Sequence, residues 1–314
     1  MCSTDFGLYA RDRRRLAPAP VRAYRGSVDE VELDWAARRP HLALRGLVSR
    51  YGGYHQRGFT MPLHRGLPSE HVTFIVSLAD PVRMIGMPGT GQGAGSWQGF
   101  ASGLHTGPAL IAPDEVQAGI QLDLNPLGVR TLLGVSASDL AGCVVDLTDL
   151  PRPGFAALPG RLREAPTWAR RFEILDEVLL ASARRDREYA PAGEIGWAWH
   201  RMRAHAGSVR IADLAADVGW SRRHFSERFA REIGLAPKQA ARVVRFGRAT
   251  AVLRGGDVLR PGGGGLGGLA HACGYFDQAH LTNEFKAMAG CTPGSWIAEE
   301  LPFLQYPGPG SEAE

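Results

Sequence analysis

The chain has 314 residues, enough for about two domains, and its 44% hydrophobic content is that of a globular protein with its own cores. No stretch approaches the roughly 18 consecutive apolar residues of a membrane-spanning helix, so we expect no membrane partner. The formal net charge is +4, and the whole excess lies in residues 193–300, which hold 14 Lys and Arg against 10 Asp and Glu. A basic segment favours a nucleic acid as partner without establishing it.

The N-terminal half has the pattern of a β-rich domain. We expect the first 20 residues (1–20), which lack apolar periodicity, to be disordered, and their basic run does not lead into the apolar core of a signal peptide. From 21 to 150, short apolar runs are broken by Gly and Pro, which is typical of strands joined by turns. The clearest runs are 71–78, 109–111 and 143–147.

The middle of the chain contains a glycine-rich stretch and a helix. Residues 86–107 are rich in glycine and are compatible with a long loop or with a pair of hairpins. Residues 151–166 form a Pro-rich connector, and a helical pattern follows over about 167–185. We place the domain boundary near 191–193, so that 151–192 is a connector and helix between two domains.

After residue 193 the chain is helical and contains an internal repeat. When the chain is shifted by 55 or 56 positions, apolar, small and glycine residues of one copy fall on residues of the same kind in the other. The pairs are Ile211 and Leu266, Leu214 and Leu269, Ala215 and Ala270, Val218 and Cys273, Gly219 and Gly274, Phe225 and Leu281, Phe229 and Phe285, Gly234 and Gly290, and Pro237 and Pro293. The second copy has one extra residue in its turn.

Each copy has the residue types of a helix-turn-helix unit. A small residue lets two helices cross closely, and glycine adopts the positive φ of a tight turn. Ser221 or Asp277 can then cap the second helix, which we expect at about 221–233 and 277–289. Such corners also occur in proteins that never bind DNA, but two copies in register in the basic third of the chain favour DNA binding.

Four motifs of this repeat carry a family resemblance: IADLA, GWSRRHF, AHACGYFDQAHL and GCTP, at residues 211–215, 219–225, 270–281 and 290–293. They resemble the DNA-binding domain of the AraC/XylS family of bacterial transcriptional regulators, over about 193–298. The resemblance implies that both second helices enter the major groove and that a connector helix, here 237–253, spaces them. The fold class is then α+β, a β-rich N-terminal domain followed by an all-α domain with two helix-turn-helix units and a flexible tail at 299–314.

The sequence departs from the family in the link before the second unit. Residues 254–268 are longer and richer in glycine than the usual link. Each glycine weakens a helix by up to ~1 kcal/mol relative to alanine. We therefore expect the second unit to be mobile until DNA orders it.

The helical period of about 100° per residue sorts the two second helices into a buried and an outward face. The base-reading candidates on the outward faces are Arg223, Ser226, Glu227, Gln278, Ala279, Thr282 and Asn283. Arg223 can donate to guanine, Glu227 can accept from cytosine, Asn283 or Gln278 can pair with adenine, and Ala279 can touch a thymine methyl. The alternative for each is an exposed residue that contacts phosphate or nothing.

Other polar side chains of this region are phosphate candidates, which fix register without reading sequence. They are Arg222, His224, Lys238, Arg242, Arg245, His280 and Lys286. For the two histidines, packing against the helix is the alternative.

We expect no enzyme activity, no cofactor and no metal. The cysteines Cys2, Cys143, Cys273 and Cys291 contain no C-x-x-C pair, and Cys273 is better explained as a core residue than as a redox sensor. The N-terminal histidines His41, His55, His64, His71 and His105 lack the spacing of a metal cluster.

The interpretation is a cytoplasmic bacterial transcription factor, activator or repressor, that joins the nucleoid when it binds double-stranded DNA. The resemblance implies that residues 21–150 form a sensory or dimerisation domain, which binds a small effector, forms a homodimer or does both, and that an activator also contacts RNA polymerase. This half more weakly resembles a poorly characterised β-rich domain found in high-GC bacteria. Two alternatives remain, a protein-interaction module with secondary DNA binding and an enzyme or repair domain fused to a helix-turn-helix domain.

Overall fold

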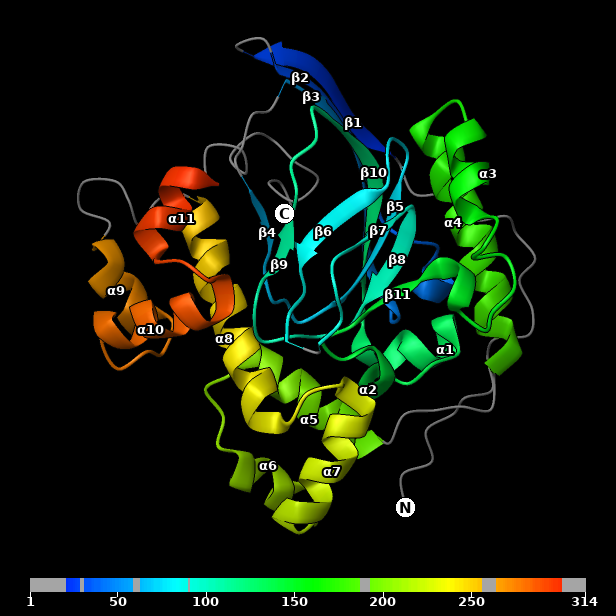
Figure 1. Cartoon of the computed structure of the whole chain (residues 1–314). Helices are drawn as coiled ribbons and strands as arrows, with labels where there is room; N and C mark the ends of the chain where they lie inside the picture. The colour runs from blue at the N-terminus through cyan, green and yellow to red at the C-terminus, as the bar shows by residue number, and fades with distance from the viewer. Residues whose placement is uncertain are drawn as a thin grey trace.

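Two antiparallel sheets dominate the N-terminal half (Figure 1). The structure, a computed structural model, describes residues 21–28, 31–58, 63–89, 91–186, 193–255 and 264–300, so the disorder expected for 1–20 lies outside the described residues. The larger sheet has the order β1 (Arg22–Val28), β2 (Val31–Arg38), β3 (Val48–Arg57), β10 (Val116–Leu124), β5 (Val72–Ser77), β8 (Gly99–Ser102) and β11 (Val144–Asp146). The smaller sheet has the order β4 (His64–Gly66), β9 (Ala109–Ile111), β6 (Val82–Gly86) and β7 (Gly95–Trp97).

The runs predicted as strands at 71–78, 109–111 and 143–147 are β5, β9 and β11. The glycine-rich stretch at 86–107 holds β7, which forms a hairpin with β6, and then β8, which pairs with β5 in the other sheet. Strand β10 lies between β3 and β5, and its side chains Ile120, Leu122 and Leu124 are buried. The core of this half therefore forms around the centre of the larger sheet.

Helices α3 (Leu158–Glu164) and α4 (Trp168–Ala183) pack on the larger sheet. The Trp168 ring lies where a Cβ on Gly53 of β3 would stand, so only glycine leaves room for it, and Phe172 stacks on Tyr51 at 5.8 Å. Asp176 of α4 pairs with the buried Arg38 and accepts a hydrogen bond from the Tyr51 hydroxyl at 2.8 Å. The segment predicted as a connector and helix thus belongs to the core of the N-terminal half.

The C-terminal part is helical. Its helices are α5 (Gly193–Ala204), α6 (Ile211–Asp217), α7 (Arg222–Ile233), α8 (Pro237–Gly255), α9 (Gly265–Ala272), α10 (Gln278–Ala289) and α11 (Pro293–Glu299). The remaining short elements are η1 (Leu42–Leu44), η2 (Pro126–Gly128), α1 (Val129–Leu133), α2 (Ala137–Leu140), η3 (Leu147–Asp149) and η4 (Arg184–Asp186). The predicted α+β class, a β-rich part followed by a helical part with two helix-turn-helix units, is confirmed.

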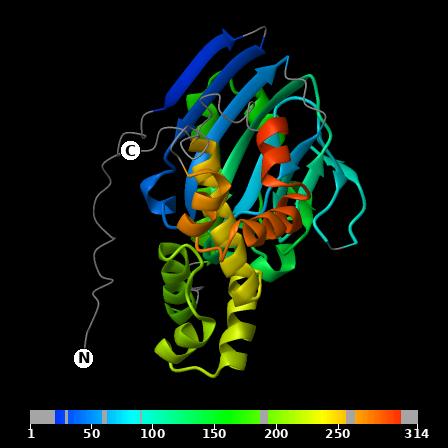
Figure 2. The same cartoon turned by 90° about the vertical axis from the view of Figure 1, so that its left-hand side faces the viewer.

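The two halves share one hydrophobic core, which runs from the larger sheet through α4 and α5 into α7, α8 and α10. Helix α7 ends against η2 and α2, and a Cβ on Gly234 would stand 2.7 Å from the carbonyl oxygen of Ala137. Figure 2 shows α8 passing between the two units, with the sheets behind the second unit and above the first. Because one core spans both halves, the packing does not show where one domain ends and the next begins. The domain boundary near 191–193 therefore stays a prediction, and residues 191–192 lie outside the described residues.

A buried carboxylate joins the end of the chain's helical part to the smaller sheet. Glu300, 1% exposed, accepts a hydrogen bond from the Arg65 guanidinium at 3.0 Å and lies 3.4 Å from His64 Nδ1. Burial alone would raise the pKa of Glu300, but hydrogen bonds from His64 and Arg65 outweigh it, and the net pKa is lowered. The tail predicted from 299 therefore begins with anchored residues, while 301–314 lie outside the described residues.

We expect Glu300→Gln to lower the free energy of unfolding by about 1.5–3 kcal/mol at pH 7, because it weakens a charged hydrogen bond in a buried site. A lowered pKa in the folded state means that the carboxylate stabilises the fold above the ordinary carboxyl pKa, and that this is lost as the pH falls through the lowered value. The gap between variant and wild type should therefore close at acid pH. Urea denaturation at pH 7 and at a pH below the lowered pKa of Glu300 measures it.

Glu299→Gln is the matched control, because Glu299 contacts the same Arg65 at 2.8 Å but is 40% exposed. An exposed pair contributes only about 0–1 kcal/mol. Equal losses in the two variants, or a gap that does not change with pH, would show that the buried carboxylate is not the stabilising group.

Candidate DNA interface

Helix α7 is built as the repeat predicted. Gly219 has a φ of +71°, and the Ser221 hydroxyl accepts a hydrogen bond from the His224 amide at 3.3 Å. Phe225 and Phe229 are fully buried, and Phe229 packs edge-on against Trp199 at 6.2 Å. Burying these two rings fixes which face of α7 is left for a partner.

The outward face of α7 carries a solvent-exposed ion pair. Arg223 Nε lies 2.9 Å from Glu227 Oε1, and the two side chains are 91% and 62% exposed. A pair at i and i+4 in solvent contributes less than about 1 kcal/mol, so it opens readily when either group meets a base. Arg222 and His224 are exposed at the start of the helix and Ser226 is partly buried.

Helix α10 repeats the construction. Gly274 has a φ of +73°, and Asp277 accepts a hydrogen bond from the His280 amide at 2.7 Å. Leu281 and Phe285 are buried, and Phe285 packs against Phe246 of α8 at 5.1 Å. The second unit is thereby fastened to α8 by its buried face.

The outward face of α10 is polar and open. Gln278, Ala279, Asn283 and Lys286 are exposed. Thr282 is half-buried, and its hydroxyl donates to the carbonyl oxygen of Gln278 at 2.8 Å. Among the described residues, the side-chain amides of Gln278 and Asn283 make no hydrogen bond, so both can meet a partner in solvent. The Thr282 hydroxyl is already engaged as a donor.

His224 and His280, the two histidines among the phosphate candidates, lie in similar environments. The His224 ring contacts Trp220 at 4.7 Å, and the His280 ring contacts the buried Tyr275 at 5.3 Å, both edge-on. His280 Nδ1 also accepts a hydrogen bond from the Phe276 amide at 3.3 Å. These contacts favour packing for His280, and phosphate contact by either histidine stays a prediction.

The predicted phosphate contacts on α8 divide into two kinds. Lys238 is exposed at the start of the helix. Arg242 instead reaches Glu284 of α10 at 3.0 Å, and this bond raises the pKa of Arg242. Arg245 donates to the carbonyl oxygen of Gly207 at 3.1 Å and lies over the Tyr275 ring. These two arginines hold α10 and the loop before α6 onto α8, and their contact with phosphate stays a prediction.

The second unit begins at a left-handed glycine. Gly264 caps α9 at a φ of +77°, and Gly267 and Gly268 are exposed within the helix. Most of the preceding link, residues 256–263, lies outside the described residues. The expected mobility of this unit remains a prediction.

In the part of the chain that the structure describes, neither Cys273 and Cys291 nor a metal-binding cluster marks a further chemical site. Burial raises the pKa of Cys273, which is 2% exposed, and that of Cys291. Raised pKa values leave less of the reactive thiolate. The described residues contain no group of three His, Cys, Asp or Glu side chains that could hold a metal ion. No described helix combines the length and apolar character needed to cross a membrane.

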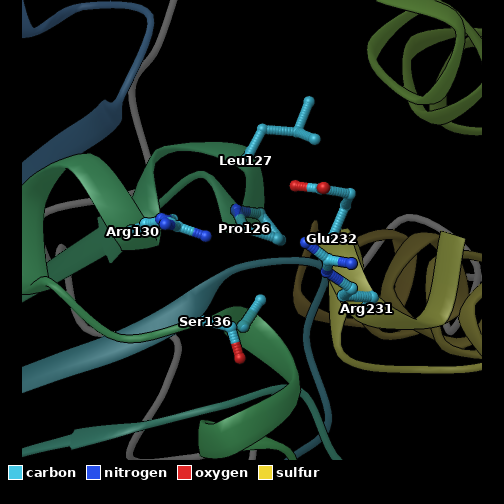
Figure 3. A pocket seen from close by; sticks show the side chains of 7 residues that line it. Pro126, Leu127, Arg130, Ser136, Arg231 and Glu232 are labelled. Atoms are coloured by element: carbon cyan, nitrogen blue, oxygen red, sulfur yellow. The ribbon is translucent and has the colours of Figure 1, made fainter. Parts of the chain in front are cut away.

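A small hollow marks the seam between the two halves (Figure 3). Its lining comes from η2, α1, α2 and the end of α7: Pro126, Leu127, Arg130, Ser136, Ala137, Arg231 and Glu232. Its volume is about 10 Å³, close to the ~10–15 Å³ needed for a single water. The hollow therefore has no room for an effector and is a packing seam under the first unit.

A comparison with protein families agrees with this geometry. Residues 214–299, which span both units, match the family described as "Helix-turn-helix domain". No curated protein matches the chain in sequence.

In overall fold the chain is similar to ToxT from Vibrio cholerae O395, with 11% identity over 82% of this chain and 98% of that one and a TM-score of 0.46. An apo ToxT variant from Vibrio cholerae strain SCE256 gives 7% identity over 79% and 97% and a TM-score of 0.48. ToxT from strain O395 bound to (E)-4-(8-methylnaphthalen-1-yl)but-3-enoic acid gives 11% identity over 81% and 98% and a TM-score of 0.43.

The match at 214–299 coincides with the internal repeat, the two capped helices and their open faces. The C-terminal part of this chain is an AraC-type helix-turn-helix domain, and the protein is a DNA-binding transcription regulator.

Proposed function

We propose that α7 and α10 enter successive major grooves of one duplex. The chain then binds an asymmetric DNA site with two boxes, each box being the short base sequence that one of the two helices contacts. The observation that carries this proposal is the pair of equivalent, open helix faces joined by α8. Helix α8 has 19 residues, a length of about 28 Å at 1.5 Å per residue, against a spacing of about 34 Å between grooves. Two units in one chain reach both grooves without a second copy, so a homodimer is not required for binding.

Base reading is assigned to the exposed polar side chains of the two faces. Arg223 suits guanine, because its fork of donors matches O6 and N7, and Asn283 suits adenine, because its amide both donates and accepts. Glu227 suits the cytosine amino group when Arg223 turns away from it. Ser226, Gln278, Ala279 and Thr282 complete the two faces.

The N-terminal half is proposed to control the DNA-binding part. The support is mechanical: α7 ends on η2 and α2, and Arg203 of α5 is held by Glu70 at 2.6 Å. A small effector or a second copy that shifts these contacts would move the first unit relative to the second. Contact with RNA polymerase belongs to this proposal for an activator, and the setting is the bacterial cytoplasm.

Salt dependence tests the phosphate contacts separately from base reading. Each neutralised phosphate lowers the slope of log K against log salt by about 0.9. Among the phosphate candidates, the exposed Lys and Arg side chains are Arg222, Lys238 and Lys286, and these three predict a slope of about −3. We expect Lys238→Gln to make the slope less negative by about 0.9 and to leave the preferred sequence unchanged. Fluorescence anisotropy on a labelled duplex between 50 and 200 mM salt, roughly the range over which such slopes are taken, measures both.

Ser226→Ala is the control for this experiment, because it removes no charge and should leave the slope as it is. A slope that Lys238→Gln does not change would remove Lys238 from the phosphate contacts. Binding with no sequence preference in the wild type would instead favour a protein-interaction module with secondary DNA binding.

A further inference from the structure

One exposed aromatic side chain is not explained by packing. Phe276 is 91% exposed, the highest value among the large hydrophobic side chains that the structure describes, where the next is Ile85 at 57%. It lies in the turn between α9 and α10, directly before the N-cap Asp277. An apolar ring in this position is costly to hydrate, and burying it against a partner is favourable.

The backbone presents this ring from a fixed position. The Phe276 amide donates to His280 Nδ1 at 3.3 Å, one turn into α10. On one side the chain is held by Tyr275, which is 3% exposed, and on the other by Asp277, which caps α10. The side chain therefore stands in solvent although its main chain is anchored on both sides.

The first unit has no counterpart of this residue. Its turn runs from Gly219 through Trp220 to the N-cap Ser221, whereas the second runs from Gly274 through Tyr275 and Phe276 to Asp277. Trp220 and Tyr275 make the same edge-on contact with a histidine, so they are the equivalent pair. Phe276 is thus the residue inserted in the turn of the second unit, and its exposed side chain does not contribute to the core of that unit.

The position of the ring suits a contact with DNA. In a helix-turn-helix unit the first residues of the second helix lie closest to the base edges. Phe276 precedes Gln278 and Ala279, which are exposed at this end of α10. An apolar side chain at the floor of the major groove meets one apolar group that distinguishes bases, the C5-methyl group of thymine.

We propose that Phe276 is a specificity-determining residue of the second unit and reads a thymine methyl at the edge of the box that α10 binds. This inference rests on the proposed function. It adds an apolar contact beside the one predicted for Ala279, in an interface whose other proposed base contacts are hydrogen bonds. Burial of one methyl group corresponds to a change in affinity of about threefold to tenfold.

The test compares thymine with uracil, which keeps every hydrogen-bonding group and lacks only the methyl. Affinities are measured by fluorescence anisotropy for wild type and Phe276→Ala on the selected duplex, with each thymine of the second box replaced in turn by uracil. For the wild type we expect one replacement to weaken binding by about threefold to tenfold. Phe276→Ala should lose a similar factor on the thymine duplex and nothing further on the uracil duplex.

Two controls keep the result interpretable. Ile85→Ala removes another exposed apolar side chain, on β6, and should leave both affinities unchanged. Thermal unfolding of Phe276→Ala should match wild type, because the removed ring makes no packing contact on which the unit depends, and Phe276→Leu should restore part of the preference for thymine.

The inference is overturned if Phe276→Ala binds like wild type, or if it weakens the thymine and uracil duplexes by the same factor relative to wild type. If the wild type selects a two-box site while Phe276→Ala does not alter it, only this inference fails. If the wild type shows no sequence preference at all, the proposed function fails and takes the inference with it.

Discussion

Arg223→Ala is expected to relax the sequence preference in the box bound by α7 and to leave the other box intact, and Asn283→Ala is expected to do the reverse. Each side chain lies on the open face of a different helix, one exposed beside Glu227 and the other exposed on α10. A good bidentate contact discriminates against a wrong base by about 1–3 kcal/mol, so enrichment at the affected position should fall by roughly 5- to 150-fold. Selection from a random duplex library near physiological salt measures it.

Glu227→Gln is the matched control for Arg223→Ala. Removing Arg223 leaves the Glu227 carboxylate without its partner near a negatively charged duplex, which weakens binding for a reason unrelated to guanine. The double variant Arg223→Ala with Glu227→Gln removes that repulsion, and the altered preference should persist. If neither Arg223→Ala nor Asn283→Ala changes any position, these faces do not read sequence.

Gly207→Ala is expected to lower the free energy of unfolding more than Gly219→Ala, which adds the same methyl group in the first helix-turn-helix turn. Gly207 has a φ of +72°, and a Cβ there would overlap the carbonyl oxygen of Ala241 in α8. The conformation costs about 1–2 kcal/mol for a residue with a Cβ, and the overlap with rigid helix backbone adds about 1–3 kcal/mol. The carbonyl oxygen of Gly207 also accepts a hydrogen bond from the Arg245 guanidinium. A backbone shift at residue 207 would therefore weaken the packing of the first unit on α8.

Gly219→Ala separates the two causes. Gly219 has nearly the same φ, +71°, but its added Cβ would meet nothing within 4 Å. It should therefore show only the conformational cost, and Ala206 at a φ of +49° is an alanine that already adopts this region. Urea denaturation of both variants gives the difference, and equal losses would mean that contact with α8 is not what requires glycine at 207.

The helix-turn-helix units could be predicted because their signals are local in the chain. Ser221 and Asp277 cap helices that begin at the next residue, and Gly219 and Gly274 adopt the positive φ that their turns require. Each of these signals occurs in both copies of the repeat, so each copy supports the prediction made from the other. Likewise the apolar runs that became β5, β9 and β11 carried their own strand pattern.

The tertiary structure alone decided which distant groups meet. The sequence pattern places the helix at 167–185 in a connector, but Trp168 covers Gly53 of β3, and this contact makes α4 part of the N-terminal core. Arg242 was predicted as a phosphate contact and is paired with Glu284, 42 residues away.

The exposure of Phe276 likewise could not be read from a motif in which the neighbouring Tyr275 is buried. Caps and turns depend on hydrogen bonds between residues a few positions apart, so the sequence by itself determined the two units and their capped helices. Burial and ion pairing depend on how the elements pack, which only the folded chain decides.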